Sequence, residues 1–275
     1  MRFLGVVFII QACSALNRTV DLSHGFDEKT IYWFGMPEFN LSEVVHEEDP
    51  FYMLAKKFAA AEHGGTHLDA PFHFNPSGWK VGDIPLDRLI VSGVMIDMGA
   101  AAAKDPDTEV KVKDLVDWEQ NYGPLPDPVA IIFNFGWAKK YSNKTEYFGM
   151  VADNESDIHF PGVSKDAAKW MVDSGKVVGV GVDTPSIDRG ANPEFIAHQV
   201  LTAANIYLME NLALADAGLP PRGFQLIVMP MKIMNGTGAP LRIVAHQVSS
   251  ATFFFSRILG WFLSIGLMIR SVFTQ

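Results

Sequence analysis

The chain has 275 residues, of which 48% are hydrophobic and 19% are charged, enough apolar material for the core of one large domain or two small ones. Its formal net charge of −9 at pH 7 and its pI of about 5.3 argue against nucleic acid as a partner, because phosphate binding requires a basic surface. This composition favours an acidic enzyme that acts on a small substrate.

Residues 1–15 have the pattern of a secretory signal peptide. A short basic start at Met1-Arg2 precedes an apolar run over 3–10, and small residues follow up to Ala15. We predict cleavage after Ala15; the alternative is a buried first strand. Cleavage removes Cys13, the only cysteine, and so excludes cysteine nucleophiles and thiolate metal sites from the mature chain.

Five sequons for N-glycosylation also favour a secretory route. We therefore predict a glycoprotein of the secretory pathway, either secreted or anchored at the extracellular or lumenal face of a membrane. The sequons begin at Asn17, Asn40, Asn143, Asn154 and Asn235.

The region before residue 63 carries weak signals. Residues 16–50 mix short apolar stretches with turn residues and end in the acidic run 47–50, which we interpret as a solvated turn. A stretch over 51–62 with clustered apolar residues then leads into His63.

The segment over 63–73, HGGTHLDAPFH, contains three histidines and one aspartate. Its glycines and proline disfavour a helix, and in an extended chain His67, Asp69 and His73 point to one side. The glycines let the backbone turn so that His63 can rejoin that side. Imidazole and carboxylate groups are ligands for zinc, manganese or iron, so the pattern predicts a metal site. A polar surface loop is the alternative.

Patterns typical of strands and helices alternate through the rest of the domain. Ser164 and Asn192 are predicted helix N-caps, and Pro193 occupies a first helical position. The interleaving predicts one α/β domain over residues 16–248. The predicted strands are 89–98, 129–135, 176–182, 206–209 and 224–229, and the predicted helices are 112–122, 164–174 and 192–203.

The histidine-rich segment resembles the His-x-Gly-Thr-His-x-Asp-x-Pro-x-His signature of the cyclase family, which includes bacterial-type kynurenine formamidases and isatin hydrolases. The resemblance implies a swivelling β/β/α fold, with a mixed sheet and flanking helices in a single domain, and a homo-oligomer. Segments at 160–164, 181–188, 210–212 and 236–240 resemble later family motifs in the same order, so the resemblance covers roughly residues 18–246.

The resemblance also implies a site for two divalent metal ions, zinc or manganese. His63, His67 and Asp69 would hold the first ion. Asp69 would bridge to a second ion held by His198 and Glu210. His73 would lie unligated beside the ions as the catalytic proton-transfer group.

The distal pair, His198 and Glu210, requires a turn in the chain. A continuous helix would hold them about 18 Å apart, too far for one ion. Asn205, followed by the strand-like residues 206–209, offers a turn that returns Glu210 toward His198. The alternative is a helix that exposes both side chains. Asp183 and Asp188 either orient ligand histidines or form turns.

By resemblance, the chain is a hydrolase that cleaves the C–N bond of a small aromatic formamide or cyclic amide with a metal-bound hydroxide. No Gly-x-Ser-x-Gly motif is present, so we expect no acyl-enzyme. The candidate substrate contacts are Phe39, Phe72, Trp79 and Trp137, although each also suits a core position.

One departure from the family pattern keeps other functions open. The family commonly has Thr-Gly-Trp where this chain has Asn134-Phe135-Gly136-Trp137. The main alternative is therefore a secreted or surface binding protein that retains the fold without turnover, and a weaker one is a structural cell-surface protein.

Residues 249–275 form a hydrophobic tail beyond the resemblance. Its uninterrupted apolar part, 258–269, follows Arg257 and is shorter than the roughly twenty residues that a membrane helix needs. The tail is a tilted anchor that contacts a membrane through 251–273, a signal exchanged for a GPI anchor, or a helix packed on the domain or a partner.

Overall fold

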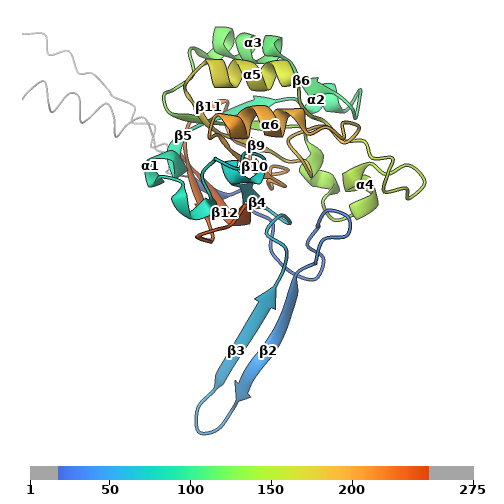
Figure 1. The fold of residues 1–275 in the computed structure, drawn as a ribbon, viewed down its shortest axis with the longest axis vertical. Helices are drawn as coiled ribbons and strands as arrows, with labels where there is room; N and C mark the ends of the chain where they lie inside the picture. Colours follow the sequence, from blue (N-terminus) through green and yellow to red (C-terminus); the bar gives the residue numbers. More distant parts are fainter. Residues whose placement is uncertain (1–17, 248–275) are drawn as a thin grey trace, which may run out of the picture.

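The computed structural model describes residues 18–247, so the predicted signal peptide and hydrophobic tail lie outside the described residues. Its centre is an eight-stranded mixed sheet in the order β1-β12-β11-β5-β7-β9-β10-β4. The last strand, β4, also pairs with β12, so the sheet closes on itself like a barrel (Figure 1). Both edges of β4 are therefore paired inside the wall.

The sheet is mixed in direction. β5, β7, β9 and β10 run parallel to one another, and helices connect them, since a parallel pair needs a crossover. β1, β4, β11 and β12 pair antiparallel. The strands are β1 (Arg18–Asp21), β4 (His67–Asp69), β5 (Ile90–Asp97), β7 (Val129–Asn134), β9 (Val177–Val182), β10 (Tyr207–Glu210), β11 (Arg222–Pro230) and β12 (Gly238–Gln247), beside the short pair β6 (Glu109–Val110) and β8 (Gly162–Val163).

Two cores lie on the two faces of the barrel wall. The alternation of β7 shows the division: Ile131 and Phe133 belong to the outer core, whereas Ala130 and Ile132 belong to the inner one. Helices α3, α5 and α6 stack over the outer face (Figure 1). The helices are α1 (Leu86–Leu89), α2 (Gly99–Ala102), α3 (Val112–Tyr122), α4 (Lys144–Phe148), α5 (Lys165–Asp173) and α6 (Ile196–Ala203), with 3-10 turns at Pro71–His73, Val81–Asp83 and Trp137–Lys140.

The predicted α/β fold with a mixed sheet and flanking helices is confirmed. Seven predicted elements appear within two residues of their expected bounds, as β5, α3, β7, α5, β9, β10 and β11. The side chain of Ser164 caps α5, where its Oγ accepts from the Ala167 N–H at 3.2 Å.

The predicted helix over 192–203 is wrong at its start. Asn192 belongs to a separate turn, in which its Oδ1 accepts from the Glu194 N–H. Phe195 follows with a φ of +51°, which no continuous helix tolerates, so α6 begins only at Ile196. β12 and the three strands before residue 63 were not predicted as strands. No helix among residues 18–247 is long and apolar enough to cross a membrane.

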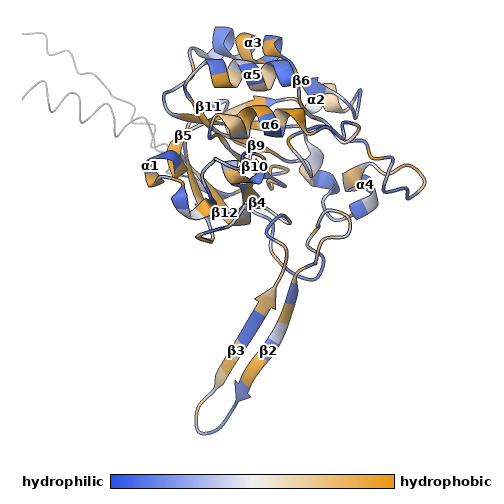
Figure 2. Cartoon of the chain, viewed as in Figure 1, coloured by the Kyte–Doolittle hydropathy of each residue, from blue (hydrophilic) through white to orange (hydrophobic). Residues whose placement is uncertain are grey.

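β2 (Asn40–Glu47) and β3 (Met53–Ala59) form an antiparallel hairpin that projects from the barrel (Figure 1). We call residues 40–59 the arm. The acidic run 47–50 lies at its tip and is exposed, as the sequence predicted. Hydrophobic and hydrophilic residues mix along both strands (Figure 2).

Candidate metal centre

The barrel wall brings the two halves of the predicted ligand set together. β4 lies between β10 and β12, and its register places His67 directly opposite Glu210. Because side chains alternate along a strand, His67 and Asp69 share one face, while Leu68 between them enters the inner core. His67 and Glu210 are 3% and 5% exposed, so the wall holds both away from bulk solvent.

Two glycines bring His63 back to this face, as the sequence predicted. A Cβ on Gly64 would overlap the ring of Tyr32, and Gly65 has a φ of +57°, a conformation that favours glycine. After this turn, the Nδ1 atom of His63 lies 2.6 Å from Oδ1 of Asp69.

A second turn brings His198 to the same place. α6 ends before Asn205, whose φ of +57° reverses the chain into β10. His198 Nε2 then lies 3.1 Å from Glu210 Oε1 and 3.3 Å from Asp69 Oδ2. The predicted turn at Asn205 is therefore present, and the alternative of an exposed His198 and Glu210 is wrong, since both side chains are buried.

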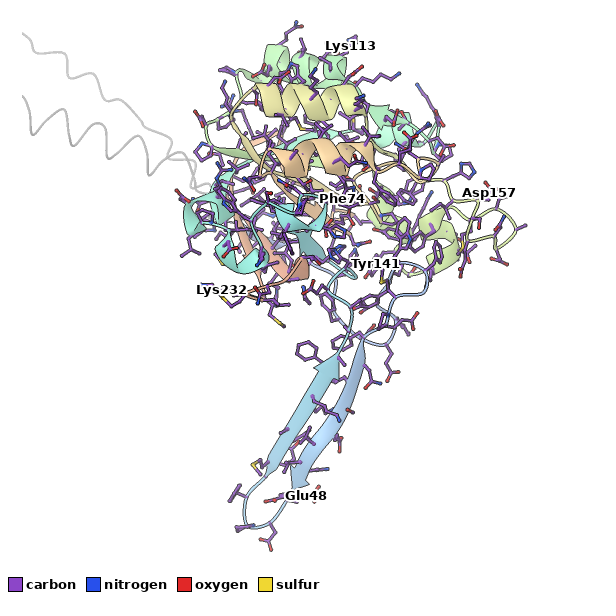
Figure 3. All side chains as sticks on the ribbon, viewed as in Figure 1. Glu48, Phe74, Lys113, Tyr141, Asp157 and Lys232 are labelled. Carbon is purple, nitrogen blue, oxygen red and sulfur yellow. The ribbon has the colours of Figure 1, made fainter. Side chains whose placement is uncertain are left out.

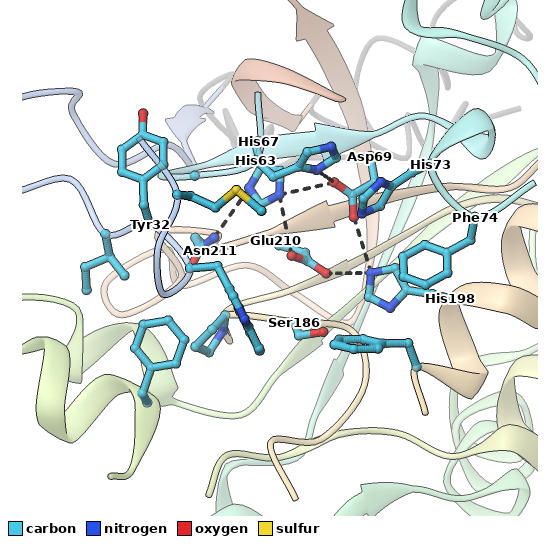
Figure 4. A pocket seen from close by; sticks show the side chains of 17 residues that line it. Tyr32, His63, His67, Asp69, His73, Phe74, Ser186, His198, Glu210 and Asn211 are labelled. Atoms are coloured by element: carbon cyan, nitrogen blue, oxygen red, sulfur yellow. Dashed lines mark hydrogen bonds and ion pairs between the residues drawn. The ribbon is translucent and has the colours of Figure 1, made fainter. Parts of the chain in front are cut away.

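The donor set has the chemistry and spacing of two cation sites that share Asp69. His63, His67 and Asp69 form one group and Asp69, His198 and Glu210 the other, each with its ligand atoms within 4.8 Å of one another. Asp69 turns Oδ1 toward the first group and Oδ2 toward the second (Figure 4). Nitrogen and carboxylate oxygen are ligands that zinc and manganese accept, so the residues fit two divalent ions.

Hydrogen bonds on the far side of each ring fix which nitrogen faces the centre. His198 Nδ1 lies 2.7 Å from Oδ2 of Asp188, and His67 Nδ1 lies 3.0 Å from the Gly65 carbonyl. Donation at Nδ1 leaves Nε2 of both rings free to bind an ion.

His63 uses the opposite tautomer. Its Nε2 lies 2.9 Å from the Thr237 hydroxyl, which itself donates to Glu62 Oε2 at 2.6 Å. Because the Thr237 hydroxyl donates its proton to Glu62, it can only accept a hydrogen bond from His63 Nε2–H. The proton of the His63 ring is therefore on Nε2, and Nδ1 is the atom free to bind an ion. Gly238 makes room, since a Cβ there would lie 2.5 Å from the His63 ring. Glu62 and Thr237 were not predicted as site residues.

Opposite charges within the cluster stabilise the charged forms of its histidine and aspartate side chains. Burial opposes charge on His67, but Asp69 and Glu210 raise its pKa to about 9. Burial likewise opposes charge on Asp69, and His63 and His67 hold the pKa of its carboxyl well below the ordinary value. Without metal, the raised pKa keeps a proton on the His67 ring, and a bound metal ion would displace that proton.

His73 lies beside this cluster and outside both ligand groups, in the position predicted for a proton-transfer group. Its ring stacks on His63, with centroids 3.9 Å apart, and it borders the cavity next to the ligands (Figure 4). Desolvation lowers the pKa of His73 to about 4, rather than leaving it near neutrality as the sequence suggested. His73 is therefore a neutral imidazole at pH 7.

A cavity of about 260 Å³ opens in front of the cluster. Its remaining wall is mainly aromatic, and Ser186 adds a buried hydroxyl that has no hydrogen-bond partner among the described residues. The arrangement suits a small, flat molecule with a polar group at the cluster. The aromatic residues of the wall are Tyr32, Trp33, Phe74, Phe148 and Phe195.

None of the four aromatic residues predicted as substrate contacts lines this cavity. Phe39 packs on Phe58 at the root of the arm. Trp137 is buried and donates to the Tyr147 carbonyl, while Trp79 and Phe72 lie under the side chains of Arg88 and Lys80. The aromatic residues of the wall come from loops and from the end of α4, with no periodicity between them, and only Phe74 was indicated by the sequence, through its position next to His73.

Asp183 and Asp188 take different roles. Asp188 accepts from the Ala197 and His198 N–H groups as well as from the His198 ring, so it orients a ligand. Asp183 instead accepts from the N–H groups of Phe135, Trp137 and Ala138, so it anchors a turn.

Comparisons with known proteins identify relatives of this chain. The Cyclase family model, described as "Putative cyclase", matches residues 20–189. The isatin hydrolase of Roseibium aggregatum is 31% identical over 192 residues, which cover 67% of this chain and 71% of the relative. The kynurenine formamidase of Salinibacter ruber is 27% identical over 229 residues, which cover 83% of this chain and 97% of the relative.

Solved structures give the same grouping. Isatin hydrolase A from Labrenzia aggregata, bound to benzyl benzoate, has a TM-score of 0.76 at 30% identity, over 85% of this chain and 94% of that chain. An isatin hydrolase bound to the product analogue thioisatinate has a TM-score of 0.77 at 26% identity, over 85% of this chain and 93% of that chain.

Proposed function

This chain belongs to the Cyclase family, and from that membership we propose that it is a metal-dependent hydrolase that cleaves the C–N bond of a small aromatic formamide or cyclic amide. One observation carries the proposal: three histidines and Glu210 converge around Asp69 at the floor of an aromatic cavity. The relatives named isatin hydrolase and kynurenine formamidase support this class of substrate.

His63, His67, Asp69, His198 and Glu210 would hold two divalent ions, zinc or manganese. When bound, such ions polarise a carbonyl oxygen and lower the pKa of water, which supplies a nucleophile at neutral pH. The residues around them keep the ligand atoms aimed at the centre: Asp188 holds His198, and Thr237 with Glu62 holds His63.

His73 would move the proton of the reaction. As a neutral imidazole, it accepts the proton that water loses when its oxygen bonds to the carbonyl carbon. It then gives that proton to the nitrogen as the C–N bond breaks. The oxygen and one hydrogen of water thus end on the carboxylic acid, and the other hydrogen ends on the amine. The stack on His63 keeps the ring beside the cluster throughout.

The aromatic wall would select the substrate. Trp33 packs edge-on against Phe148 and Phe195, with centroids 5.5 and 6.2 Å away, and this packing makes a rigid apolar surface for an aryl ring. The Ser186 hydroxyl would pair with a second polar group of the substrate, because it has no partner of its own among the described residues.

A binding protein without turnover is the second candidate. Its motivation is the departure at Asn134-Phe135, but Phe135 is buried in the outer core and does not line the cavity. The departure therefore lies outside the residues that would perform the reaction, which favours the enzyme.

Turnover separates the two candidates. The purified full chain, supplied with zinc or manganese, is assayed against a panel of aryl formamides and cyclic imides. We expect hydrolysis of at least one member, lost on His67→Ala. Metal binding without turnover across the panel would favour the binding protein.

Passage through the secretory pathway, with cleavage after Ala15, N-glycosylation and membrane contact through 251–273, also stays a proposal. The pattern of residues 1–15 and the five sequons support it. A shift in mass after glycosidase treatment, with N-terminal sequencing of the mature protein, tests it.

A further inference from the structure

Asn211 is a residue of the cavity wall to which the proposed reaction gives no role. It follows Glu210 directly, is 4% exposed and lines the cavity beside His67 (Figure 4). Its backbone is held from two sides, because its N–H donates to the Thr184 carbonyl at 3.1 Å and its carbonyl accepts from the Thr66 hydroxyl at 2.7 Å. The Asn211 side chain therefore starts from a fixed position at the edge of the metal centre.

The buried hydroxyl of Tyr147 determines which end of the Asn211 amide faces the cavity. This hydroxyl lies 2.9 Å from Oδ1 of Asn211 and 3.0 Å from the Asp183 carbonyl oxygen, and it donates to these two acceptors. The Tyr147 ring is held in turn by Tyr141, which packs edge-on against it with centroids 5.2 Å apart, in the body of the molecule above the arm (Figure 3). The amide oxygen of Asn211 is thus occupied, and its nitrogen is the end that remains for a ligand.

The amide nitrogen of Asn211 finds no acceptor in the neighbouring His67 ring. Its Nδ2 atom lies 3.4 Å from His67 Nδ1, but that ring nitrogen carries the proton that is donated to the Gly65 carbonyl. Two donors face each other there, so this contact is not a hydrogen bond. The Asn211 amide can therefore donate to a molecule in the cavity.

The Asn211 amide lies beside the metal centre rather than in it. His67 points Nε2 toward Asp69, 3.1 Å from Oδ1, whereas Asn211 approaches the ring from the Nδ1 side. The amide would therefore meet a different part of the substrate from the carbonyl that is cleaved at the centre. The Ser186 hydroxyl can donate or accept, but an amide nitrogen only donates, so the group at Asn211 must be an acceptor.

The rest of the cavity wall indicates that this acceptor is uncharged. No lysine or arginine among residues 18–247 lines the cavity, so a carboxylate at Asn211 would be buried without a cationic partner. A carbonyl oxygen accepts hydrogen bonds without carrying a charge, and an aryl group beside it would pack on the aromatic wall.

Resting on the proposed hydrolase function, we propose that the Asn211 amide donates a hydrogen bond to a second carbonyl oxygen of the substrate, next to the amide that is cleaved. Asn211 is then a substrate-binding residue that selects aromatic amides with a neighbouring acyl group over analogues without that oxygen. Tyr147 is a positioning residue that keeps the nitrogen of Asn211 toward the cavity. One neutral hydrogen bond of this kind changes kcat/KM by about 3- to 10-fold.

Two substrates of matched shape test the proposal. 2-Acetylformanilide carries the second carbonyl, whereas 2-isopropylformanilide has a methyl group in place of its oxygen. The purified full chain, supplied with zinc or manganese, is assayed for kcat/KM with both, as the wild type and as Asn211→Gly. Glycine removes the amide and accepts the φ of +56° at this position. We expect the acetyl-to-isopropyl ratio of kcat/KM to fall by about 3- to 10-fold, while metal content and kcat/KM for the isopropyl substrate stay near wild type.

Further variants separate the amide from its place in the backbone. Asn211→Asp keeps the size of the side chain but replaces the donor with an acceptor, so the ratio should fall further than in Asn211→Gly. Tyr147→Phe lets the amide turn and should lower the ratio less. Asn121→Asp, exposed on α3, is the matched control and should keep the wild-type ratio. Unchanged circular dichroism shows that each variant folds.

Three results would overturn the contact and leave the hydrolase in place. They are an unchanged ratio in Asn211→Gly, an equal loss for both substrates, and a loss of bound metal, since the last two would make Asn211 a structural residue of the centre. A wild type that hydrolyses neither these two substrates nor any other member of the panel would instead overturn the proposed function and the contact together.

Discussion

The metal centre and the arm are neighbours in sequence but differ in burial: the centre is buried and the arm is exposed. The arm ends at Ala59, and His63 follows four residues later. Asp69, His67 and Glu210 are 1%, 3% and 5% exposed and are held by contacts from three strands, whereas every residue of β3 is exposed. The side chains of the centre are packed on several sides, whereas those of the arm lack such packing among residues 18–247.

The largest effect should follow from substitution of Asp69, the ligand that both metal groups share. Asp69→Asn keeps the shape of the side chain but removes the charge that both ligand groups use. We expect loss of bound metal and a fall in activity of roughly 1,000-fold or more, because both ions contribute to the transition state. Elemental analysis and turnover measure the change, with exposed Asp87→Asn as the matched control. Full activity in Asp69→Asn would show that this carboxylate does not join two ions.

Removal of the proton-transfer group should come next. His73→Ala is expected to lower kcat by about 10²- to 10⁴-fold, the usual contribution of general acid–base catalysis, while metal content stays at the wild-type level. His46→Ala removes a histidine of the exposed arm that does not line the cavity, and it should leave kcat unchanged. A loss of metal along with activity would instead assign His73 to the ligand set.

The tautomer of His63 gives a finer test. Glu62→Gln and Thr237→Val each disturb the chain of hydrogen bonds that leaves Nδ1 free. We expect metal affinity to fall by about 10- to 100-fold, as for other groups that orient ligands. Calorimetric titration with zinc measures the affinity, and nitrogen-15 NMR of the metal-free protein reports the tautomer. Wild-type metal affinity in both variants would show that neither Glu62 nor Thr237 orients His63.

The smallest effect should come from His159, a half-buried histidine outside both regions. The carboxylates of Asp107 and Asp157 accept hydrogen bonds from the His159 ring and raise its pKa. A raised folded-state pKa means that this stabilisation is complete below the unfolded pKa of about 6.5 and is lost as pH rises through the folded value. His159→Gln should therefore lower Tm slightly at pH 5.5 and not at pH 9. A larger deficit at pH 9 would contradict this assignment.

Sequence predicted the centre better than the surfaces around it. The ligands came from a dense motif, and the turn at Asn205 followed from the distance between His198 and Glu210. The sequence could not show the roles of Glu62 and Thr237, because their hydrogen bond joins residues 175 positions apart. The aromatic wall was missed for a similar reason: Trp33, Phe148 and Phe195 are distant in sequence and come into contact only in the folded chain.

The same contrast holds for secondary structure. Buried strands such as β7 and β9 are continuous apolar runs and were found. β2 and β3 follow no strict alternation, since Val44 forms an irregularity between the pairs of Glu43 and Val45, and neither face of the arm is buried within residues 18–247. Without a buried face, the arm shows no regular alternation of apolar and polar residues from which its strands could be predicted.

The most direct test of the central claim is the metal content of the full chain, purified without chelator and supplied with zinc and manganese. We expect close to two ions per chain, with a clear fall in His67→Ala. A folded chain that binds none would contradict the metal centre and, with it, the proposed hydrolase.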